Sequence, residues 1–373
     1  MSDGGSIEDL LEGTTICLCV GSGGVGKTTT SAAIAAGMAA RGKRVAVLTI
    51  DPAKRLADSL GLDELANAET RVDPGLFEAA GVDTGGGELW ATMLDAKATF
   101  DEMVARYAPD AETEERILAN RIYKEISGAL AGSQEYMAME KLYEIHERGE
   151  YDLLVLDTPP SRNALDFLDA PQRLVQFIEG RSLRIFLRPA GIGARIAGGA
   201  SSAVFSVLRR LTGLDLMQDL SEFFAATSGM IGGFRERAER VSSLLGAEGT
   251  RFMIVTGPGG PAVEEAVFLR EKLSEGNLPL GGVVVNRVHA GGGSAGHDEA
   301  KAALGAQLKD AELVEAILAA DDAANALAVR DEAAIADLLE RIGRSPLLRV
   351  PEMTDEVHDL AGLLRLGPYL FGD

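Results

Sequence analysis

The fold of this chain can be inferred from one segment, Ile16-Cys-Leu-Cys-Val-Gly-Ser-Gly-Gly-Val-Gly-Lys-Thr-Thr-Thr-Ser31. The apolar run Ile16–Val20 predicts a strand, and the alanine-rich run Thr28–Ala40 predicts a helix. The glycine-rich turn between them fits the phosphate-loop pattern G-x-x-x-x-G-K-[ST]. In such loops backbone N–H groups surround a phosphate at a helix N-terminus, the lysine meets the outer phosphates and the hydroxyl ligates Mg²⁺. The segment therefore predicts a nucleoside-triphosphate site that uses Mg²⁺.

The predicted nucleotide site consists of nine consecutive residues, one of which, the lysine, is also expected to act in catalysis. They are Gly21, Ser22, Gly23, Gly24, Val25, Gly26, Lys27, Thr28 and Thr29. Three of the glycines also fit G-x-G-x-x-G, and Asp51 stands where a dinucleotide-binding fold places its ribose-binding acid. The cation and hydroxyls of Lys27, Thr28 and Thr29, directly after the last glycine, favour a triphosphate over a nicotinamide dinucleotide.

The order of apolar runs predicts an α/β fold of the P-loop NTPase class, with a mostly parallel twisted sheet flanked by helices. A second strand, expected at Val45–Ile50, follows the first helix at the spacing of a βαβ unit. Further strands are predicted at Leu153–Leu156, Phe252–Thr256, Leu280–Val285 and Leu347–Val350, and a helix at Pro261–Ser274. In such sheets the functional residues gather at the carboxyl ends of the strands.

Two aspartates follow predicted strands at this edge. Asp51 is expected to position or polarise a water at the γ-phosphate, although it could instead cap the short helix predicted at Lys54–Leu60. Asp157 ends a buried strand, where P-loop proteins hold Mg²⁺ and its water.

We expect a single ATPase domain over residues 1–373, with a helical subdomain inserted into it. The core segments are expected at about 14–62, 150–164, 250–290 and 345–373, the helical subdomain at 92–148 and 165–248, and an alanine-rich helical insertion at 291–343. Within the acidic, glycine-rich residues 63–90, Gly85–Gly87 are expected to form a surface loop, and residues 357–370 are expected to form one amphipathic helix that packs on the sheet.

A basic, apolar stretch lies within the predicted helical subdomain. Six arginines and no acidic residue occur between residues 180 and 214, in a chain of formal net charge -21. Such a stretch suits an apolar partner or a membrane surface, or its arginines could pair with carboxylates elsewhere on the protein. The apolar residues among these arginines include Ile185, Phe186, Ile192, Ile196, Phe205 and Leu208.

Composition excludes several classes of function. The negative charge disfavours nucleic acid, which proteins bind by neutralising phosphates with Lys and Arg. The two cysteines, Cys17 and Cys19, share one face of a strand and are expected to be core thiols, and the scattered histidines give no zinc site. No signal peptide and no apolar run of membrane-spanning length is visible, so a cytoplasmic protein without an integral membrane segment is expected.

Three motifs together resemble the arsenite-pump and tail-anchored-protein-targeting ATPases, a family in the deviant Walker A class that also holds the MinD and ParA ATPases. Gly23–Thr29 resembles their phosphate loop, Asp51–Asp58 their switch I and Asp157–Asn163 their switch II. The match looks closest to the actinobacterial branch, through residues 101–104, 134–142 and 161–171. It covers nearly the whole chain, including the helical insertions after each switch.

The resemblance implies roles for particular residues. Asp51 would position the attacking water, and Thr28 and Asp157 would serve Mg²⁺. Asn286 and the loop at Pro351 would hold adenine. It also implies a nucleotide-driven dimer whose helical subdomains form a hydrophobic groove for a client, such as a membrane-protein segment, where the six apolar residues above fall.

Departures from the family pattern limit the transfer. Ser22 stands where the family carries a lysine that reaches the other subunit's phosphates, so a homodimer is expected to hydrolyse ATP slowly. The missing charge could come from Lys54 or Arg55, or from a paralogous partner that keeps the lysine, which would make a heterodimer. The cysteines that clamp zinc between subunits in eukaryotic relatives are absent, and no thiol outside the first strand could bind As(III).

Three functions follow in order of support. The first is an ATP-hydrolysing switch that handles a hydrophobic client, and the second is a weakly active regulatory or scaffolding subunit of a heterodimeric ATPase. The third is a MinD- or ParA-like positioning ATPase, peripheral at the membrane, which the acidic start of the C-terminal helix disfavours.

Overall fold

The computed structural model describes residues 5–50, 55–63, 65–121, 123–124, 134–158, 230–291, 297–308 and 310–372. The chain divides into two compact units. Unit 1 comprises residues 1–93, 149–164 and 246–373, and unit 2 comprises residues 94–148 and 165–245. The residues predicted to line a client groove lie outside the described residues, as do Asp51 and Lys54.

Unit 1 is built on an eight-stranded sheet in the order β3-β4-β2-β5-β1-β6-β7-β8. All neighbouring strands pair in parallel except β3 with β4. The strands are β1 (Ile16–Val20), β2 (Arg44–Thr49), β3 (Thr70–Arg71), β4 (Glu88–Met93), β5 (Leu153–Asp157), β6 (Thr250–Thr256), β7 (Leu280–Val288) and β8 (Leu347–Pro351). The sheet with its flanking helices confirms the predicted α/β class of P-loop NTPases.

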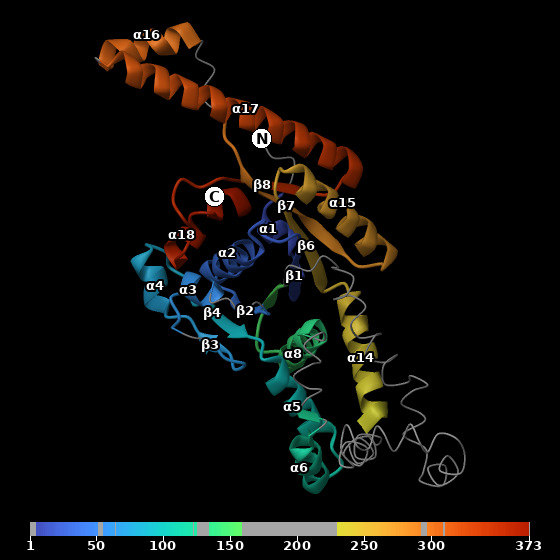
Figure 1. Cartoon of the computed structure of the whole chain (residues 1–373). Helices are drawn as coiled ribbons and strands as arrows, with labels where there is room; N and C mark the ends of the chain where they lie inside the picture. Colours follow the sequence, from blue (N-terminus) through green and yellow to red (C-terminus); the bar gives the residue numbers. More distant parts are fainter. Residues whose placement is uncertain are drawn as a thin grey trace, which may run out of the picture. The chain divides into compact units, whose positions relative to one another are not determined.

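The helices of unit 1 pack on this sheet or on one another (Figure 1). They are α1 (Ile7–Leu10), α2 (Lys27–Ala40), α3 (Arg55–Ser59), α4 (Pro74–Ala79), α15 (Gly260–Glu275), α16 (His297–Gln307), α17 (Ala311–Ile342), α18 (Leu360–Leu364) and α19 (Gly367–Leu370). The core lies between α2 and the central strands, all five residues of β1 being buried. Cys17 and Cys19 are free, fully buried thiols, as predicted, and the hydrogen bond between them and their burial raise the pKa of Cys17.

Unit 1 differs from the prediction in one place and has additional elements in another. The surface loop predicted at Gly85–Gly87 is present as a turn before β4, but the preceding residues, for which no element was predicted, contain β3 and α4, and β4 itself pairs in parallel with β2. The expected single C-terminal helix is two short ones, α18 and α19. Pro368, in the first turn of α19, has no N–H to donate to the carbonyl of Leu364, so the first helix cannot continue through it. Both helices pack against α2 (Figure 1).

The end of β7 is held to α17 by a buried carboxylate. Asp331 is fully buried and accepts hydrogen bonds from the backbone N–H of His289 at 3.0 Å and from its Nδ1 at 2.7 Å. The His289 Nε2 lies 3.1 Å from Glu352 Oε2, just after β8. Burial raises the pKa of Asp331, but the hydrogen bonds from His289 and Arg330 outweigh it and hold the pKa below its usual value. The cluster thus joins β7, β8 and α17.

We expect Asp331→Asn to destabilise the chain by about 1.5–3 kcal/mol at pH 7, because a hydrogen-bonded, buried charge is removed. The folded-state pKa is depressed, so ionised Asp331 stabilises the fold above its ordinary pKa of 3.8, and this contribution is lost as the pH falls through the folded-state pKa. Urea unfolding at pH 7 and pH 3 measures both free energies. A difference between wild type and variant that stays constant over that range would contradict the assignment.

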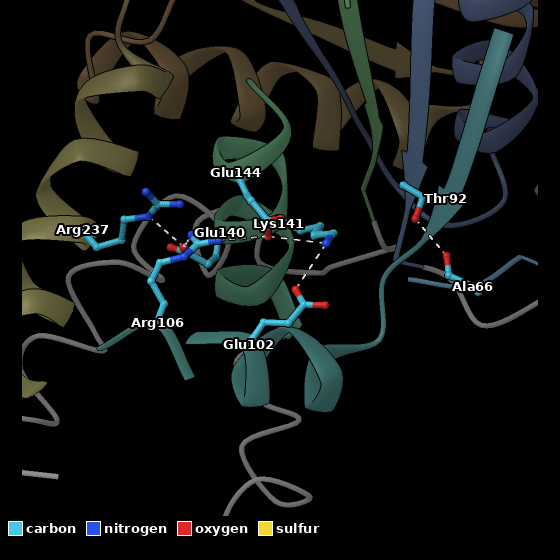
Figure 2. Close-up of polar contacts among 8 residues, drawn as sticks. All are labelled: Ala66, Thr92, Glu102, Arg106, Glu140, Lys141, Glu144 and Arg237. Carbon is cyan, nitrogen blue, oxygen red and sulfur yellow. Dashed lines mark hydrogen bonds and ion pairs between the residues drawn. The ribbon is translucent and has the colours of Figure 1, made fainter. Parts of the chain in front are cut away.

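The described part of unit 2 is helical, and a buried ion pair joins two of its helices. Its helices are α5 (Ala96–Tyr107), α6 (Ala111–Ala119), α8 (Gln134–Arg148) and α14 (Ile231–Leu245). Figure 2 shows Glu140 of α8 facing Arg237 of α14, with Glu140 Oε1 2.8 Å from Arg237 Nε. Arg106 of α5 approaches the same carboxylate at 3.9 Å. Burial raises the pKa of Glu140, against the opposing effect of Arg237.

No helix among the described residues is both long enough and apolar enough to cross a membrane.

Candidate nucleotide-binding site

The phosphate loop follows β1 and ends where α2 begins, at Lys27. β1 lies at the centre of the sheet, between β5 and β6. From β1 the chain crosses to β2 on one side, whereas from β6 it crosses to β7 on the other. Open parallel sheets bind ligands at such a reversal, outside the carboxyl ends of the strands. The loop therefore occupies the position in the sheet where a nucleotide is expected.

Two glycines of the loop lie so close to neighbouring atoms that a side chain at either position would force a shift. A Cβ on Gly21 would lie 2.0 Å from the carbonyl oxygen of Val255 in β6, so the loop passes close to the neighbouring strand. Gly26 has φ +92°, and a Cβ there would lie 2.2 Å from Asn286 Nδ2. The same amide nitrogen donates to the carbonyl oxygen of Val25 at 2.9 Å. Both Gly21 and Gly26 are therefore positions where the loop requires glycine.

The lysine and threonine side chains of the phosphate-loop motif lie at the start of α2. Lys27 is buried, and its Nζ donates to the carbonyl oxygen of Ser22 at 2.7 Å, so the ammonium group lies across the loop. Thr28 Oγ1 donates to Asp157 Oδ2 at 2.7 Å. Thr49, the last residue of β2, donates to the same oxygen at 3.0 Å. One buried carboxylate therefore joins the ends of β2 and β5 to the helix N-terminus.

The donor set around Asp157 suits a magnesium ion. Mg²⁺ prefers hard oxygen ligands, and it is bound in phosphate-transfer sites by one or two protein oxygens together with phosphates and waters. Thr28 Oγ1 and the Asp157 carboxylate are such oxygens, and they lie within hydrogen-bond distance of each other beside the phosphate loop. The residues present therefore fit the ion.

A pocket of about 370 Å³ lies against the outer side of the phosphate loop. Its walls include Ser22 from the loop, Pro261 and Glu265 from α15, and Asn286 and Arg287 from β7. The pocket lies between segments that follow β1 and β6, at the same reversal of the sheet. An acidic and a basic side chain thus face the space beside the loop.

The structure brings most of the predicted site residues together. The loop residues, Asp157 and Asn286 converge through the contacts above. Pro351 ends β8 and pairs in register with Val288, two residues beyond Asn286. Arg55, proposed as a source of positive charge, is exposed at the start of α3.

Sequence reasoning missed Thr49 and Thr158. Thr158 Oγ1 donates to the carbonyl oxygen of Cys19 at 2.8 Å, which ties the end of β5 to β1. Thr49 is the only hydroxyl residue in the otherwise apolar end of β2, and this interruption is the signal that could have identified it.

The sequence model of the anion-transporting ATPases matches residues 14–294, which is more than half of the chain. The chain belongs to the anion-transporting ATPase family. This confirms the predicted resemblance. The matched region includes the phosphate loop, Asp157 and Asn286, and it ends before α16.

Three of the curated relatives of this family member are named as ATPases. The ATPase get3 of Schizosaccharomyces japonicus is 31% identical over 173 residues, which cover 45% of this chain and 48% of the relative. An ATPase ASNA1 homolog of Trypanosoma cruzi is 29% identical over 308 residues, covering 76% and 77%. A putative arsenical pump-driving ATPase of Halobacterium salinarum is 28% identical over 186 residues, covering 49% and 28%. The chain thus spans about half the length of the first of these and less than a third of the last.

Proposed function

We propose that the chain is a Mg²⁺-dependent ATPase that works as a nucleotide-driven dimeric switch. The observation that carries this proposal is the contact of Asp157 with both Thr28 and Thr49 beside the phosphate loop. In this arrangement the loop N–H groups bind the phosphates, and Lys27 exchanges the Ser22 carbonyl for the outer phosphates. Bound Mg²⁺ would neutralise the charge that develops on the phosphates. Membership of an ATPase family supports the same activity.

Asp157 also offers a route from the nucleotide to switch I. Its carboxylate contacts Thr28, which would bind the ion, and Thr49, which lies two residues before Asp51. A change in metal or γ-phosphate at Thr28 therefore acts on the same carboxylate that holds the end of β2. We propose that Asp51 positions the attacking water there, and that Asn286 and Pro351 hold adenine.

The helical unit is proposed to bind the client. Its stretch at 180–214 is basic and apolar, which suits a hydrophobic membrane-protein segment, and residues 185–208 would line the groove. The resemblance of the three motifs to the tail-anchored-protein-targeting ATPases supports a client-handling role, whereas the relatives named get3 and ASNA1 support the ATPase activity. We propose a cytoplasmic protein, a homodimer or a heterodimer, that meets the membrane only at its periphery.

Asp51→Asn provides the test of this function, because it should slow hydrolysis while leaving ATP bound. We expect the variant, purified with ATP, to be dimeric and to retain apolar peptide segments that the wild type releases. Lys27→Ala, which should lose ATP, is the matched control and should retain none. If Asp51→Asn hydrolyses ATP at the wild-type rate, or if both variants recover the same segments, the switch proposal is wrong.

Ser22 favours a second candidate, a regulatory subunit of a heterodimeric ATPase. The family's lysine is absent at this position, and a trans-acting cation of this type contributes on the order of 10³–10⁵ in rate. Ser22→Lys should then raise hydrolysis by the chain alone by at least about tenfold. Turnover and partner binding that both stay unchanged in Ser22→Lys would argue against this candidate.

A further inference from the structure

Two neighbouring residues of β7 reach the phosphate loop, which a regular strand does not allow. Side chains of consecutive strand residues point to opposite faces of a sheet. Here Asn286 Nδ2 donates to the carbonyl oxygen of Val25 at 2.9 Å, and Arg287 Nη1 donates to that of Gly24 at 3.4 Å. The register of β7 against β8 shifts between Val285 and Val288, and Arg287 has φ +60°. The bulge therefore aims both side chains at one target.

The left-handed backbone of Arg287 indicates that its contact with the phosphate loop has a function. Among the described residues, only Asn277 and Arg287 have positive φ without being glycine. Such a conformation is uncommon for a long side chain, and it persists only where the surroundings hold it. Bulges re-aim side chains next to binding sites. The guanidinium contact with the loop gives this conformation a function that glycine could not supply.

The two hydrogen bonds orient the inner face of the loop. The carbonyl of Gly24 shares a peptide plane with the N–H of Val25, and the carbonyl of Val25 shares one with the N–H of Gly26. In a trans peptide the carbonyl and the N–H point in opposite directions, and no described peptide bond is cis. Holding two consecutive carbonyls on the outer side therefore directs two consecutive N–H groups to the other side. Consecutive N–H groups that face one way form a concave anion site.

We infer that Arg287 is a positioning residue for the phosphate loop, which acts with Asn286 to preorganise the loop for the phosphates. Its guanidinium also places a positive charge beside Ser22, in the pocket that Glu265 shares. The inference rests on the proposed nucleotide site and deepens it. Because Arg287 acts on the loop backbone and not on the terminal phosphate, it contributes equally to binding of a triphosphate and of a diphosphate.

Arg287→Gly tests this, since glycine accepts the positive φ and removes the side chain with its guanidinium. We expect binding of both ATP and ADP, measured with fluorescent analogues in the presence of Mg²⁺, to weaken about five- to tenfold. Arg287→Lys, which keeps a cationic donor, should recover most of the affinity. Asn277→Gly removes a side chain at the other positive φ and is the matched control, with unchanged affinity. Hydrogen exchange of the nucleotide-free loop, residues 21–27, should be faster in Arg287→Gly than in Arg287→Lys or Asn277→Gly.

Unchanged affinity and unchanged loop exchange in Arg287→Gly would overturn the inference. A loss confined to ATP would also overturn it, because it would place the guanidinium on the terminal phosphate. If the wild-type chain binds no nucleotide, the proposed function fails, whereas the exchange of the nucleotide-free loop still decides whether Arg287 holds it.

Discussion

Replacing Gly26 by alanine should abolish measurable nucleotide binding. Alanine at φ +92° is strained by about 1–2 kcal/mol, and its Cβ would lie 2.2 Å from the Asn286 amide that braces the loop. Either the loop backbone or the Asn286 side chain must move, and both belong to the predicted site. Isothermal titration with ATP and Mg²⁺ measures the loss, and circular dichroism checks that the chain remains folded.

Gly24→Ala separates the strain from the clash. Gly24 also has a positive φ, of +79°, but a Cβ there meets no protein atom within 4 Å. This variant should therefore bind ATP about tenfold more weakly, as expected for backbone strain alone. Equal losses in Gly24→Ala and Gly26→Ala would show that the approach of Asn286 to the loop is unimportant.

Replacing Arg237 by methionine should lower the free energy of opening of unit 2 by about 3–5 kcal/mol, the cost of leaving a buried charge without its partner. Glu140 is 1% exposed, and Arg237 contacts it from α14 while its guanidinium stacks on the ring of Tyr143, 3.9 Å from the centroid. Hydrogen exchange of the α8 and α14 amides reports this opening.

The effect should depend on pH in a definite direction. Burial already raises the pKa of Glu140 above its ordinary value of 4.5, and loss of Arg237 raises it further. The folded state then binds a proton that the unfolded state does not, so the destabilisation shrinks as the pH falls from 7 toward 4.5. Glu140→Gln combined with Arg237→Met should recover much of the loss at pH 7.

Arg240→Met is the control, because Arg240 lies on the same helix but is exposed, where it pairs with Glu236 and hydrogen-bonds Tyr143 of α8. It should lower the free energy of opening far less than Arg237→Met does. A pH-independent loss in Arg237→Met, or no recovery in the double variant, would contradict the role of the buried pair.

The predictability of the fold differs between its elements for physical reasons. β1 and α2 could be predicted because burial demands apolar residues in the central strand and the loop demands glycine. β4 was missed because Glu88 and Thr92 interrupt its apolar residues; Glu88 is only partly buried, and Thr92 is buried and donates to the carbonyl oxygen of Ala66. The break after α18 was missed because the apolar periodicity continues through Leu366, between the two helices, and Leu370, in α19, and both residues are buried.

The site residues, too, could be predicted only where the local sequence marks them. Its loop residues and Asp157 are marked by local sequence, because each stands at a strand end or a helix start. Arg287 was not identified, since its contact with Gly24 depends on a bulge and on a positive φ that a sequence pattern does not reveal. Thr49 contacts Asp157 only because β2 and β5 pair with those two residues in register.

Titration of the nucleotide-free chain with ATP, in the presence and absence of Mg²⁺, tests the proposed site most directly. We predict binding that Mg²⁺ strengthens in the wild type, that loses this Mg²⁺ dependence in Asp157→Asn, and that disappears in Lys27→Ala. Absence of ATP binding by the wild-type chain, or equal binding by wild type and Lys27→Ala, would contradict the assignment of the phosphate loop as the nucleotide site.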